Sequence, residues 1–450
     1  MQSKLVLCAV LSLLCSVAAA QWLETTLAVG DYPDALCYNS VNNKVYCASV
    51  GAGGNDIVTV IDGATNLVTA EITVGPDACG LCYNPVANKV YCSYWNYGVV
   101  TVICGAGDTI IADVPAQICR GPMCCDSAGN KVYCGGDTGA VTVICGEGDS
   151  VLAVVQAGAD IEAACYSPDY RKVFCGSVFW PDPDSAYVLD CDFDSVVAVL
   201  PVGEEPTGMC YNPTNGCVYC LADYDYMMSV IDCATNQLVA AIDVGYGQSS
   251  ICCAPAENKV FCTTYDGRLV VIDAASNTIV DSLPISGNPD KLFYNPLNNK
   301  VYCASPESSS VIVVDGATHG VLRTIGVGAS PIAFCHNPVQ NRVYVANFDG
   351  SSVSVIRDST SGGVEEAMND ESGTMKPGST IVRGVLLLEA RGEKREARSE
   401  LLDISGRKVL DLNPGANDVR ALAPGVYFVC EAHQAAGPKP QAVRKVVIPR

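Results

Sequence analysis

The chain has 450 residues, of which 49% are hydrophobic and 17% charged, and it carries a formal net charge of −21. This apolar content can build a large core, which excludes a disordered acidic protein. The acidic balance argues against nucleic acid as a partner, because nucleic acid requires a basic face. Only three histidines are present, which leaves little for histidine-based chemistry, and we expect no metal and no cofactor.

Residues 1–20 predict a secretory signal peptide. Lys4 supplies a positive charge, residues 5–17 form an apolar run, and three alanines end at Ala20. The alternative is a membrane anchor, but the run is shorter than the ~20 residues that span a bilayer. No later stretch reaches that length. We therefore expect no transmembrane segment after cleavage, and a mature protein in an oxidising compartment.

A five-residue phrase, Asn-Lys-Val-Tyr-Cys at 43–47, recurs along the chain at a spacing of about 42 residues. Its aromatic position is occupied by Tyr46, Tyr91, Tyr133, Phe174, Tyr219, Phe261, Tyr302 and Tyr344. Each copy has four strand-like segments, and none shows a sustained helical period. The pattern predicts an all-β, eight-bladed β-propeller over residues 21–357. Seven blades is the alternative, if the degenerate copy around Arg171 or Gly216 is an insertion.

The two ends of the repeat array indicate how the ring closes. The last copy stops at Arg357 without a fourth segment, whereas residues 22–29 read like a fourth segment with nothing before it. We predict that the N-terminal strand completes the last blade, because this removes two exposed sheet edges. A closed ring of this kind is expected to be a monomer.

The repeat resembles the YVTN family of β-propellers, which occur in bacterial and archaeal extracytoplasmic proteins. Val-Tyr-Val-Ala-Asn at 343–347 is close to the sequence that names the family, and residues 58–66 match the second half of its repeat. The resemblance covers residues 22–357 and implies the propeller fold. It departs from the family in carrying Cys where members usually have an aliphatic residue.

The composition changes after the propeller. Residues 358–379 are polar and read as a linker, and residues 380–450 predict a small Ig-like β-sandwich. Residues 21–375 hold thirteen basic and forty acidic side chains, against thirteen and eight in 376–450. This asymmetry favours two separate modules.

The C-terminal module resembles the sorting domain of type IX secretion cargo, through the segments 402–409, 422–429 and 445–448. The resemblance implies contact with the secretion machinery and passage through the periplasm to the outer surface of a Gram-negative-type bacterium, or release from it. Cleavage and anchoring of the domain both stay open, and an ordinary Ig-like accessory domain is the alternative. The candidate motif residues are Asp403, Gly406, Arg407, Gly425, Tyr427 and Lys445.

Cysteines recur ten residues apart in six copies, on either side of a predicted hairpin. Residues opposed across a hairpin lie within disulfide reach, so we expect one bridge per blade or, alternatively, free buried thiols that act as small apolar side chains. The six pairs are Cys37/Cys47, Cys82/Cys92, Cys124/Cys134, Cys165/Cys175, Cys210/Cys220 and Cys252/Cys262. In the last two copies Phe293 and Val345 replace one cysteine each, which fits apolar packing. The spacing does not match a zinc site.

Aromatic residues gather in the loop between the second and third segments of copies two, four and five. They are Tyr94, Trp95, Tyr97, Phe179, Trp180, Tyr224 and Tyr226. Equivalent loops lie on one face of a propeller, so these side chains form a candidate binding surface for protein or carbohydrate. Packing between blades is the alternative.

No pattern of a nucleophile with a base, and no phosphate-binding loop, stands out in the sequence. The sequence therefore favours a secreted or cell-surface binding module without catalytic activity. Two alternatives stay open. One is an extracytoplasmic enzyme of the lactonase or quinoprotein type, since related propellers include both, and the other is a structural surface-layer or adhesion protein.

Overall fold

A computed structural model describes residues 21–51, 56–120, 122–178 and 184–358, together with seven strands between 379 and 448. The predicted signal peptide and most of the predicted linker lie outside these residues. The chain divides into two compact units, one of which spans residues 20–359. Each unit is described by itself.

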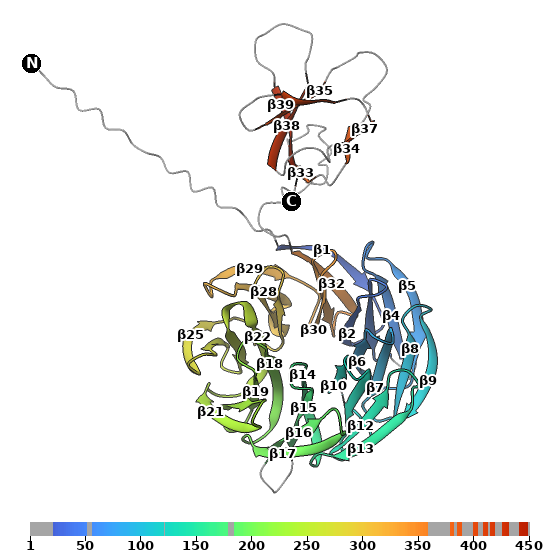
Figure 1. Ribbon diagram of the computed structural model, residues 1–450, viewed down its shortest axis with the longest axis vertical. Helices are drawn as coiled ribbons and strands as arrows, with labels where there is room; N and C mark the ends of the chain where they lie inside the picture. Colours follow the sequence, from blue (N-terminus) through green and yellow to red (C-terminus); the bar gives the residue numbers. More distant parts are fainter. Residues whose placement is uncertain are drawn as a thin grey trace, which may run out of the picture. The chain divides into compact units, whose positions relative to one another are not determined.

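The first unit is a ring of eight four-stranded antiparallel sheets (Figure 1). This confirms the eight-bladed propeller. The seven-blade alternative is wrong, because the copies around Arg171 and Gly216 each form a complete sheet, in the orders β14-β15-β16-β17 and β18-β19-β20-β21.

The strands of each blade run from the channel outwards in chain order, and blades are numbered 1 to 8 from the first complete one. Blades 1 to 4 contain β2(Pro33–Asn39), β3(Lys44–Ser49), β4(Ile57–Asp62), β5(Val68–Thr73); β6(Ala78–Asn84), β7(Lys89–Tyr94), β8(Val99–Cys104), β9(Thr109–Pro115); β10(Met123–Asp126), β11(Lys131–Gly135), β12(Ala140–Cys145), β13(Val151–Gln156); and β14(Asp160–Ser167), β15(Lys172–Val178), β16(Ser185–Asp190), β17(Ser195–Pro201). Blades 5 to 8 contain β18(Pro206–Asn212), β19(Cys217–Ala222), β20(Met227–Asp232), β21(Gln237–Asp243); β22(Gln248–Ala254), β23(Lys259–Thr264), β24(Arg268–Asp273), β25(Thr278–Pro284); β26(Leu292–Asn295), β27(Lys300–Ser305), β28(Ser310–Asp315), β29(Val321–Gly326); and β30(Pro331–Asn337), β31(Arg342–Asn347), β32(Ser352–Asp358). Two 3-10 turns, η1(Pro255–Glu257) and η2(Pro306–Ser308), are the helical elements of the described residues.

The eighth blade takes its outer strand from the other end of the propeller. β1(Gln21–Ala28) pairs antiparallel with β32, and Figure 1 shows the two strands side by side in dark blue and brown. Glu24 of β1 accepts two hydrogen bonds from the guanidinium of Arg342, at 2.5 and 2.7 Å. The sequence predicts a closing strand in this position.

The Asn and Asp residues that recur in the hairpins and turns of the repeat are explained by the backbone conformation at those positions. Asn43 ends the first hairpin at φ 53°, in the left-handed region that Asn tolerates better than most residues. In the turn after the third strand, Asp62 Oδ1 accepts hydrogen bonds from the backbone N–H groups of Ala64 and Thr65, and Asn66 follows at φ 60°. Hairpin and turn residues therefore recur because the backbone conformation recurs.

The Lys and Tyr of the repeated phrase bind the turn of the next blade, and we call this contact the inter-blade clamp. Lys44 Nζ lies 2.6 Å from Asp108 Oδ2, and the Tyr46 hydroxyl donates to Asp108 Oδ1 over 2.6 Å. Lys131 and Tyr133 bind Asp194 in the same way. Five of the six remaining interfaces keep parts of the clamp, through Lys89–Asp149, Lys172–Asn236, Tyr219–Asn277, Lys300–Asp358 and Tyr344–Asn66. At the interface of blades 6 and 7, Lys259 instead lies 3.8 Å from Asp273 of its own blade.

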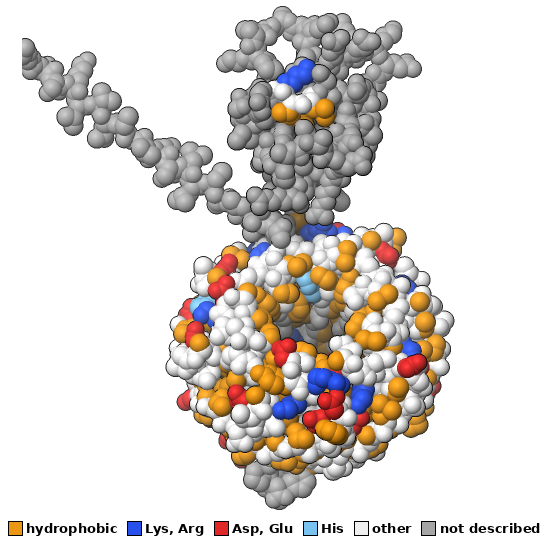
Figure 2. All heavy atoms as spheres, viewed as in Figure 1, with side chains coloured by type: hydrophobic (Ala, Val, Ile, Leu, Met, Phe, Trp, Pro, Cys, Tyr) orange, Lys and Arg blue, Asp and Glu red, His pale blue; other side chains and the backbone are white. Residues whose placement is uncertain are grey.

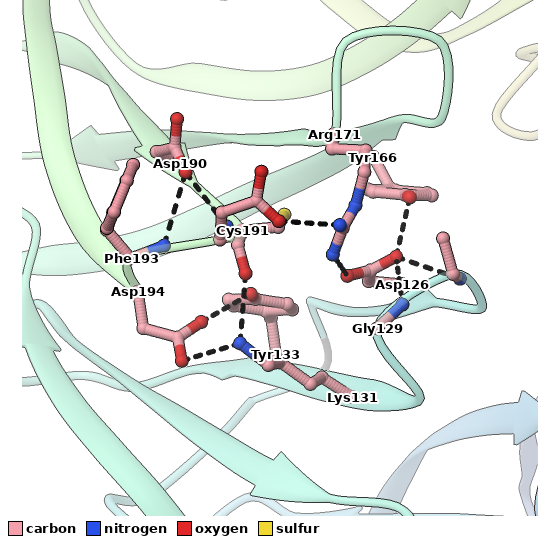
Figure 3. A network of polar contacts seen from close by, with 12 residues as sticks. Asp126, Gly129, Lys131, Tyr133, Tyr166, Arg171, Asp190, Cys191, Phe193 and Asp194 are labelled. Carbon is pink, nitrogen blue, oxygen red and sulfur yellow. Dashed lines mark hydrogen bonds and ion pairs between the residues drawn. The ribbon is translucent and has the colours of Figure 1, made fainter.

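At one interface between neighbouring blades, an ion pair replaces the hydrogen bond between two asparagine side chains that most other interfaces have. Asn39, Asn84, Asn212, Asn295 and Asn337 donate to the hairpin Asn of the next blade. Between blades 3 and 4 the pair is Asp126 and Arg171, 3.0 Å apart, beside the clamp of Lys131 and Asp194 (Figure 3). Burial raises the pKa of Asp126, but hydrogen bonds from Tyr166, Gly129 N–H and Arg171 outweigh it and hold that pKa below its usual value.

The core lies between neighbouring sheets. Val45, Tyr46, Cys47 and Ala48 of β3 are fully buried. Because successive residues of a strand point to opposite faces, Tyr46 packs toward blade 2 and Cys47 toward blade 8. Each sheet is therefore apolar on both faces, which explains the high hydrophobic content of the chain.

The second unit carries a five-stranded sheet of order β33-β39-β38-β35-β36 and a two-stranded sheet of β34 and β37. The strands are β33(Ser379–Ile381), β34(Val385–Leu388), β35(Ser399–Asp403), β36(Lys408–Leu412), β37(Gly415–Asp418), β38(Gly425–Glu431) and β39(Gln441–Ile448). Asp403 pairs with Tyr427, and Lys445 pairs with Phe428. Of the predicted motif residues, Gly406 and Arg407 lie outside the described part of the chain. Within the described part, no helix is long and apolar enough to cross a bilayer.

The inter-blade clamp predicts a specific loss of stability in Lys89→Met. Lys89 is 14% exposed and binds both carboxylate oxygens of Asp149 at 2.7 and 2.8 Å, so its removal leaves a largely buried carboxylate unpaired. We expect the free energy of unfolding, measured by urea denaturation, to fall by about 1–3 kcal/mol. Lys291→Met is the control, because Lys291 is 49% exposed and lies 3.7 Å from Asp290; it should change stability by less than about 0.5 kcal/mol. Equal losses in both variants would contradict the clamp.

The turn aspartates predict acid sensitivity. Backbone and side-chain hydrogen bonds from Thr235 lower the pKa of Asp232, and Ser276 does the same for Asp273. A carboxyl whose pKa is lower in the folded state stabilises the fold above its unfolded pKa and loses this contribution as the pH falls through the folded pKa. We therefore expect the free energy of unfolding to decrease below about pH 4. In Asp232→Asn the decrease should be shallower, and an unchanged slope would contradict this role.

Candidate functional site

The loops that join the second to the third strand of a blade lie at the same end as those that join one blade to the next, because strand direction alternates. The two sets are hydrogen-bonded to each other. Trp95 N–H donates to the Asp77 carbonyl over 2.9 Å, and Asp223 N–H donates to the Glu205 carbonyl over 3.0 Å. We call this end of the propeller the loop face.

The structure divides the aromatic residues of copy two. Tyr94 is fully buried at the end of β7, where its hydroxyl donates to Thr101 Oγ1 over 2.6 Å. The prediction that Tyr94 is an exposed binding residue is therefore wrong. Its side chain points inward, and its hydroxyl forms a hydrogen bond with Thr101 of the neighbouring strand β8. Trp95 and Tyr97 are 44% and 48% exposed, and the Arg120 guanidinium carbon lies 5.8 Å from the centre of the Trp95 ring. Phe179 and Trp180 lie outside the described residues.

Three tyrosines of blades 5 and 6 have rings in contact on the loop face, and together with the exposed Tyr224 of the same loop as Tyr226 we call them the tyrosine surface. Tyr226 and Tyr246 have ring centres 5.3 Å apart, and Tyr246 and Tyr265 have ring centres 6.4 Å apart. Tyr224 lies two residues from Tyr226 and is 62% exposed, while the other three are 42–61% exposed. Sequence reasoning found Tyr224 and Tyr226 and missed the other two.

The signal for the missed residues was present in the sequence. Tyr246 stands between Gly245 and Gly247 in the loop that joins blades 5 and 6. A Cβ on Gly247 would lie 1.9 Å from Tyr265 Cδ2, so the absence of a side chain there lets the Tyr265 ring lie flat against the loop. An aromatic residue between two glycines, after a fourth strand, marks a ring exposed on a tight loop.

Carboxylates surround the tyrosine surface. The Tyr224 N–H donates to the Glu204 carbonyl over 3.3 Å, and the Glu204 N–H donates to Asp225 Oδ2 over 2.9 Å. Burial, followed by the charge of Asp223, raises the pKa of Tyr265. Burial, followed by the charges of Asp223, Asp184 and Glu204, raises the pKa of Glu205. The surface thus combines aromatic rings with a concentration of negative charge.

A shallow cavity of about 440 Å³ adjoins Tyr265. Its wall includes Asp266 and Glu307, which add two acidic side chains, and Ile285, which adds an apolar one. The cavity extends the tyrosine surface toward blade 7.

Charged residues also gather where the innermost strands begin. Arg120 lies 4.0 Å from Asp160, and burial raises the pKa of Asp160. Burial also raises the pKa of Asp34, which Trp95 and Lys291 partly offset. Figure 2 shows one face of the ring, hollowed at its centre, with side chains of both signs on one side of the hollow. Within the described residues, no group of three His, Cys, Asp or Glu side chains is arranged to hold a metal ion.

The predicted within-blade cysteine pairs do not face each other. Cys37 pairs with Tyr46, whereas Cys47 pairs with Leu36. Because neighbouring residues of a strand point to opposite faces, the two thiols lie on opposite sides of the sheet. The same register separates Cys82 from Cys92, Cys124 from Cys134, Cys165 from Cys175, Cys210 from Cys220, and Cys252 from Cys262. All cysteines of the described propeller, from Cys37 to Cys335, are free thiols.

Each repeat cysteine instead shares an apolar cluster with a cysteine of the neighbouring blade. Cys37 and Cys92 lie in one cluster, and Cys335 and Cys47 lie in another. The cluster between blades 7 and 8 holds Phe293 and Val345, the two residues that replace cysteine in the repeat. The exceptions of the sequence therefore meet in a single interface.

No protein-family model matches the chain, and no curated protein matches it. Solved structures with a similar fold include Sqt1 of Saccharomyces cerevisiae, with a TM-score of 0.65 and 12% identity over 76% of this chain and 99% of that one. Sqt1 of Chaetomium thermophilum, bound to the N-terminus of the ribosomal protein L10, gives a TM-score of 0.64 and 14% identity over 76% and 100% of the two chains. The computationally designed Ika8 protein gives 0.60 and 17% over 75% and 100%. At these identities the likeness shows the propeller fold.

Substitution of the two aromatic residues at the end of β7 should change the free energy of unfolding by unequal amounts. Tyr94→Phe removes a buried hydroxyl that binds Thr101 Oγ1 and accepts from Gly75 N–H, so the free energy of unfolding should fall by about 1–2 kcal/mol. Trp95→Ser changes an exposed ring and should alter stability by less than about 0.5 kcal/mol. Urea denaturation of both variants measures the difference. A larger loss of stability in Trp95→Ser than in Tyr94→Phe would contradict the buried role of Tyr94 and the exposed role of Trp95.

Proposed function

We propose that this protein is an extracytoplasmic interaction module, and that its tyrosine surface binds a positively charged segment of a partner protein. The observation that carries the proposal is the contact between Tyr226, Tyr246 and Tyr265 on the loop face, surrounded by carboxylates. Exposed clusters of this kind cost solvation free energy and are typical of binding surfaces.

The chemistry of the surface favours lysine and arginine over other ligands. An ammonium or guanidinium group is attracted to the face of a tyrosine ring, and it also pairs with carboxylates such as Asp225 and Asp266. Both side chains are exposed. Arginine suits the site best, because its planar group stacks on a ring while its N–H groups reach a carboxylate.

Two further observations support the proposal. Sqt1 of Chaetomium thermophilum, which has a similar fold, is bound to the N-terminus of a ribosomal protein, so a propeller of this fold can bind a terminal segment of another protein. The signal-like residues 1–20, the resemblance of the repeat to the YVTN family and the sorting-like segment 402–409 support an address outside the cytoplasm. Secretion is part of the proposal.

Binding is tested with an arginine-rich peptide of about ten residues as the probe. We expect the triple variant Tyr224→Ser, Tyr246→Ser and Tyr265→Ser to weaken binding at least tenfold, because aromatic anchors dominate such interfaces. Phe193→Ser is the matched control, since Phe193 is 78% exposed on a turn at the opposite end of the propeller. Isothermal titration at low salt gives the affinities. Equal binding by the triple variant and the control, or binding of an oligosaccharide but not of the peptide, would overturn the proposal.

The proposal also predicts a dependence on pH. Because burial and neighbouring carboxylates raise the pKa of Glu205, this side chain becomes neutral at a higher pH than an ordinary glutamate. Lowering the pH from 7 to 5 should therefore weaken binding of the peptide. In Glu205→Gln the affinity at pH 7 should be lower and its change with pH smaller, and an unchanged pH profile would remove Glu205 from the binding surface.

A further inference from the structure

The innermost strands of neighbouring blades place one repeated residue opposite another. In five interfaces of the described propeller, a cysteine of one blade shares its apolar cluster with a tyrosine of the next. These pairs are Cys37/Tyr83, Cys124/Tyr166, Cys165/Tyr211, Cys252/Tyr294 and Cys335/Tyr38. In a sixth interface Phe293 and His336 have ring centres 5.7 Å apart.

The tyrosine of this pair has a structural task. The Tyr38 hydroxyl donates to Asn43 Oδ1 over 2.9 Å and so braces its own hairpin. Tyr294 makes the same bond to Asn299 over 3.1 Å, and His336 reaches Asn341 over 3.2 Å. A residue without a long polar side chain at this position gives up the brace.

Two interfaces lack the brace and carry a second cysteine instead. Cys125 stands where other blades have tyrosine and shares a cluster with Cys82, and Cys253 does the same with Cys210. The replacement is not conservative in size or hydrogen bonding. Its distinctive result is that a thiol of one blade faces a thiol of the next.

The Cys210/Cys253 pair combines proximity with access. The two side chains pack against the same apolar cluster from the neighbouring innermost strands β18 and β22. Both side chains are half-buried, and both line a cavity of about 500 Å³ together with Tyr294. A small reagent can therefore reach the pair.

Other thiol pairs of the described propeller are more enclosed. Cys119 and Cys134 also share an apolar cluster, but each is only 1% exposed. In the equivalent pair of blades 2 and 3, Cys82 is 8% exposed. Access therefore distinguishes Cys210 and Cys253.

We propose that Cys210 and Cys253 are a covalent modification site, at which blades 5 and 6 become joined by a disulfide through exchange with an external disulfide. Because the two cysteines lie on neighbouring strands and in one apolar cluster, rotation of their side chains is the movement that brings the sulfurs to the S–S distance of about 2.05 Å. The bond joins residues about 43 positions apart, so it restricts the unfolded chain substantially.

The reaction balances as two successive thiol–disulfide exchanges. The Cys253 thiolate attacks one sulfur of the reagent and displaces the other as a thiolate, which takes up the proton that Cys253 lost. The Cys210 sulfur then attacks the Cys253 sulfur of the mixed disulfide and displaces the second half of the reagent as a thiol. Two protein thiols are oxidised, and one reagent disulfide is reduced to two thiols. Burial and the neighbouring thiol raise the pKa of Cys210 well above its usual value, which disfavours Cys210 as the first nucleophile.

The test uses full-length protein incubated under native conditions with oxidised glutathione. Free thiols are then alkylated, the protein is digested without reductant, and the peptides are identified by mass spectrometry. We expect one linked species that joins the peptides of Cys210 and Cys253, two hydrogen masses below their sum, and alkylated Cys119 and Cys134. The oxidised protein should also melt several degrees higher than the reduced protein.

The matched control is Cys253→Tyr, which restores the residue found in five other blades and with it the hairpin brace. We expect this variant to fold, to give no linked species and to show no oxidant-dependent change in Tm. Recovery of alkylated Cys210 and Cys253 peptides from the oxidised wild-type protein would overturn the proposal, as would glutathione retained on Cys253 without a link to Cys210. The peptide map of the oxidised wild-type protein shows whether the disulfide forms, even if the variant fails to fold.

Discussion

The propeller depends on the clamp that a lysine and a tyrosine of one blade make with the turn of the next. An apolar interface alone fixes neither the angle nor the register between two sheets, because hydrophobic contact is non-directional. The bonds from Lys44 and Tyr46 to Asp108 are directional and nearly enclosed by protein. Since the acceptor belongs to the following blade, each clamp fixes the orientation of one sheet against the next.

The clamp explains why so much of the fold can be predicted from the sequence. Asn43, Lys44 and Tyr46 recur together because one residue turns the hairpin and two reach the next blade, so the phrase encodes a tertiary contact as well as a strand. Where the phrase degenerates, a compensating pair appears, as with Asp126 and Arg171. Periodicity of this kind survives changes at single positions, and the blade count is therefore robust.

Of the two interpretations of the repeat cysteines, the within-blade disulfide is wrong for a reason of parity, and the free buried thiol agrees with the structure. In this hairpin Asn39 is opposite Lys44, so opposed residues are an odd number of positions apart as far as the bulge between Pro33 and Ala35, a stretch that includes Cys37 and Cys47. A spacing of ten is even and necessarily places the two side chains on different faces. Whether the two cysteines share a face depends on the exact number of residues in the hairpin loop. The sequence pattern did not define that number to within one residue.

The candidate site was only partly predictable because exposure depends on one or two residues at a strand end. Tyr94 and Trp95 are adjacent, yet one is buried and the other is 44% exposed, since β7 ends between them. Tyr246 and Tyr265 belong to different loop types and come together only when the ring is formed. A sequence repeat predicts the residues and contacts that recur in every blade. The candidate binding surface consists of loop residues that differ from blade to blade, so the repeat does not predict it.

Closure by β1 has a consequence for the order of folding. Gln21 and Asp358 are bonded across 337 positions of the chain, so the last sheet cannot form until the propeller sequence has been synthesised in full. Joining the ends of so long a segment costs about 5 kcal/mol of chain entropy if nothing is folded in between. Seven blades formed in succession remove most of that cost by bringing the two ends together. The ring is therefore most exposed to aggregation just before closure, when β32 presents an unpaired edge and β1 is the one strand that fits it.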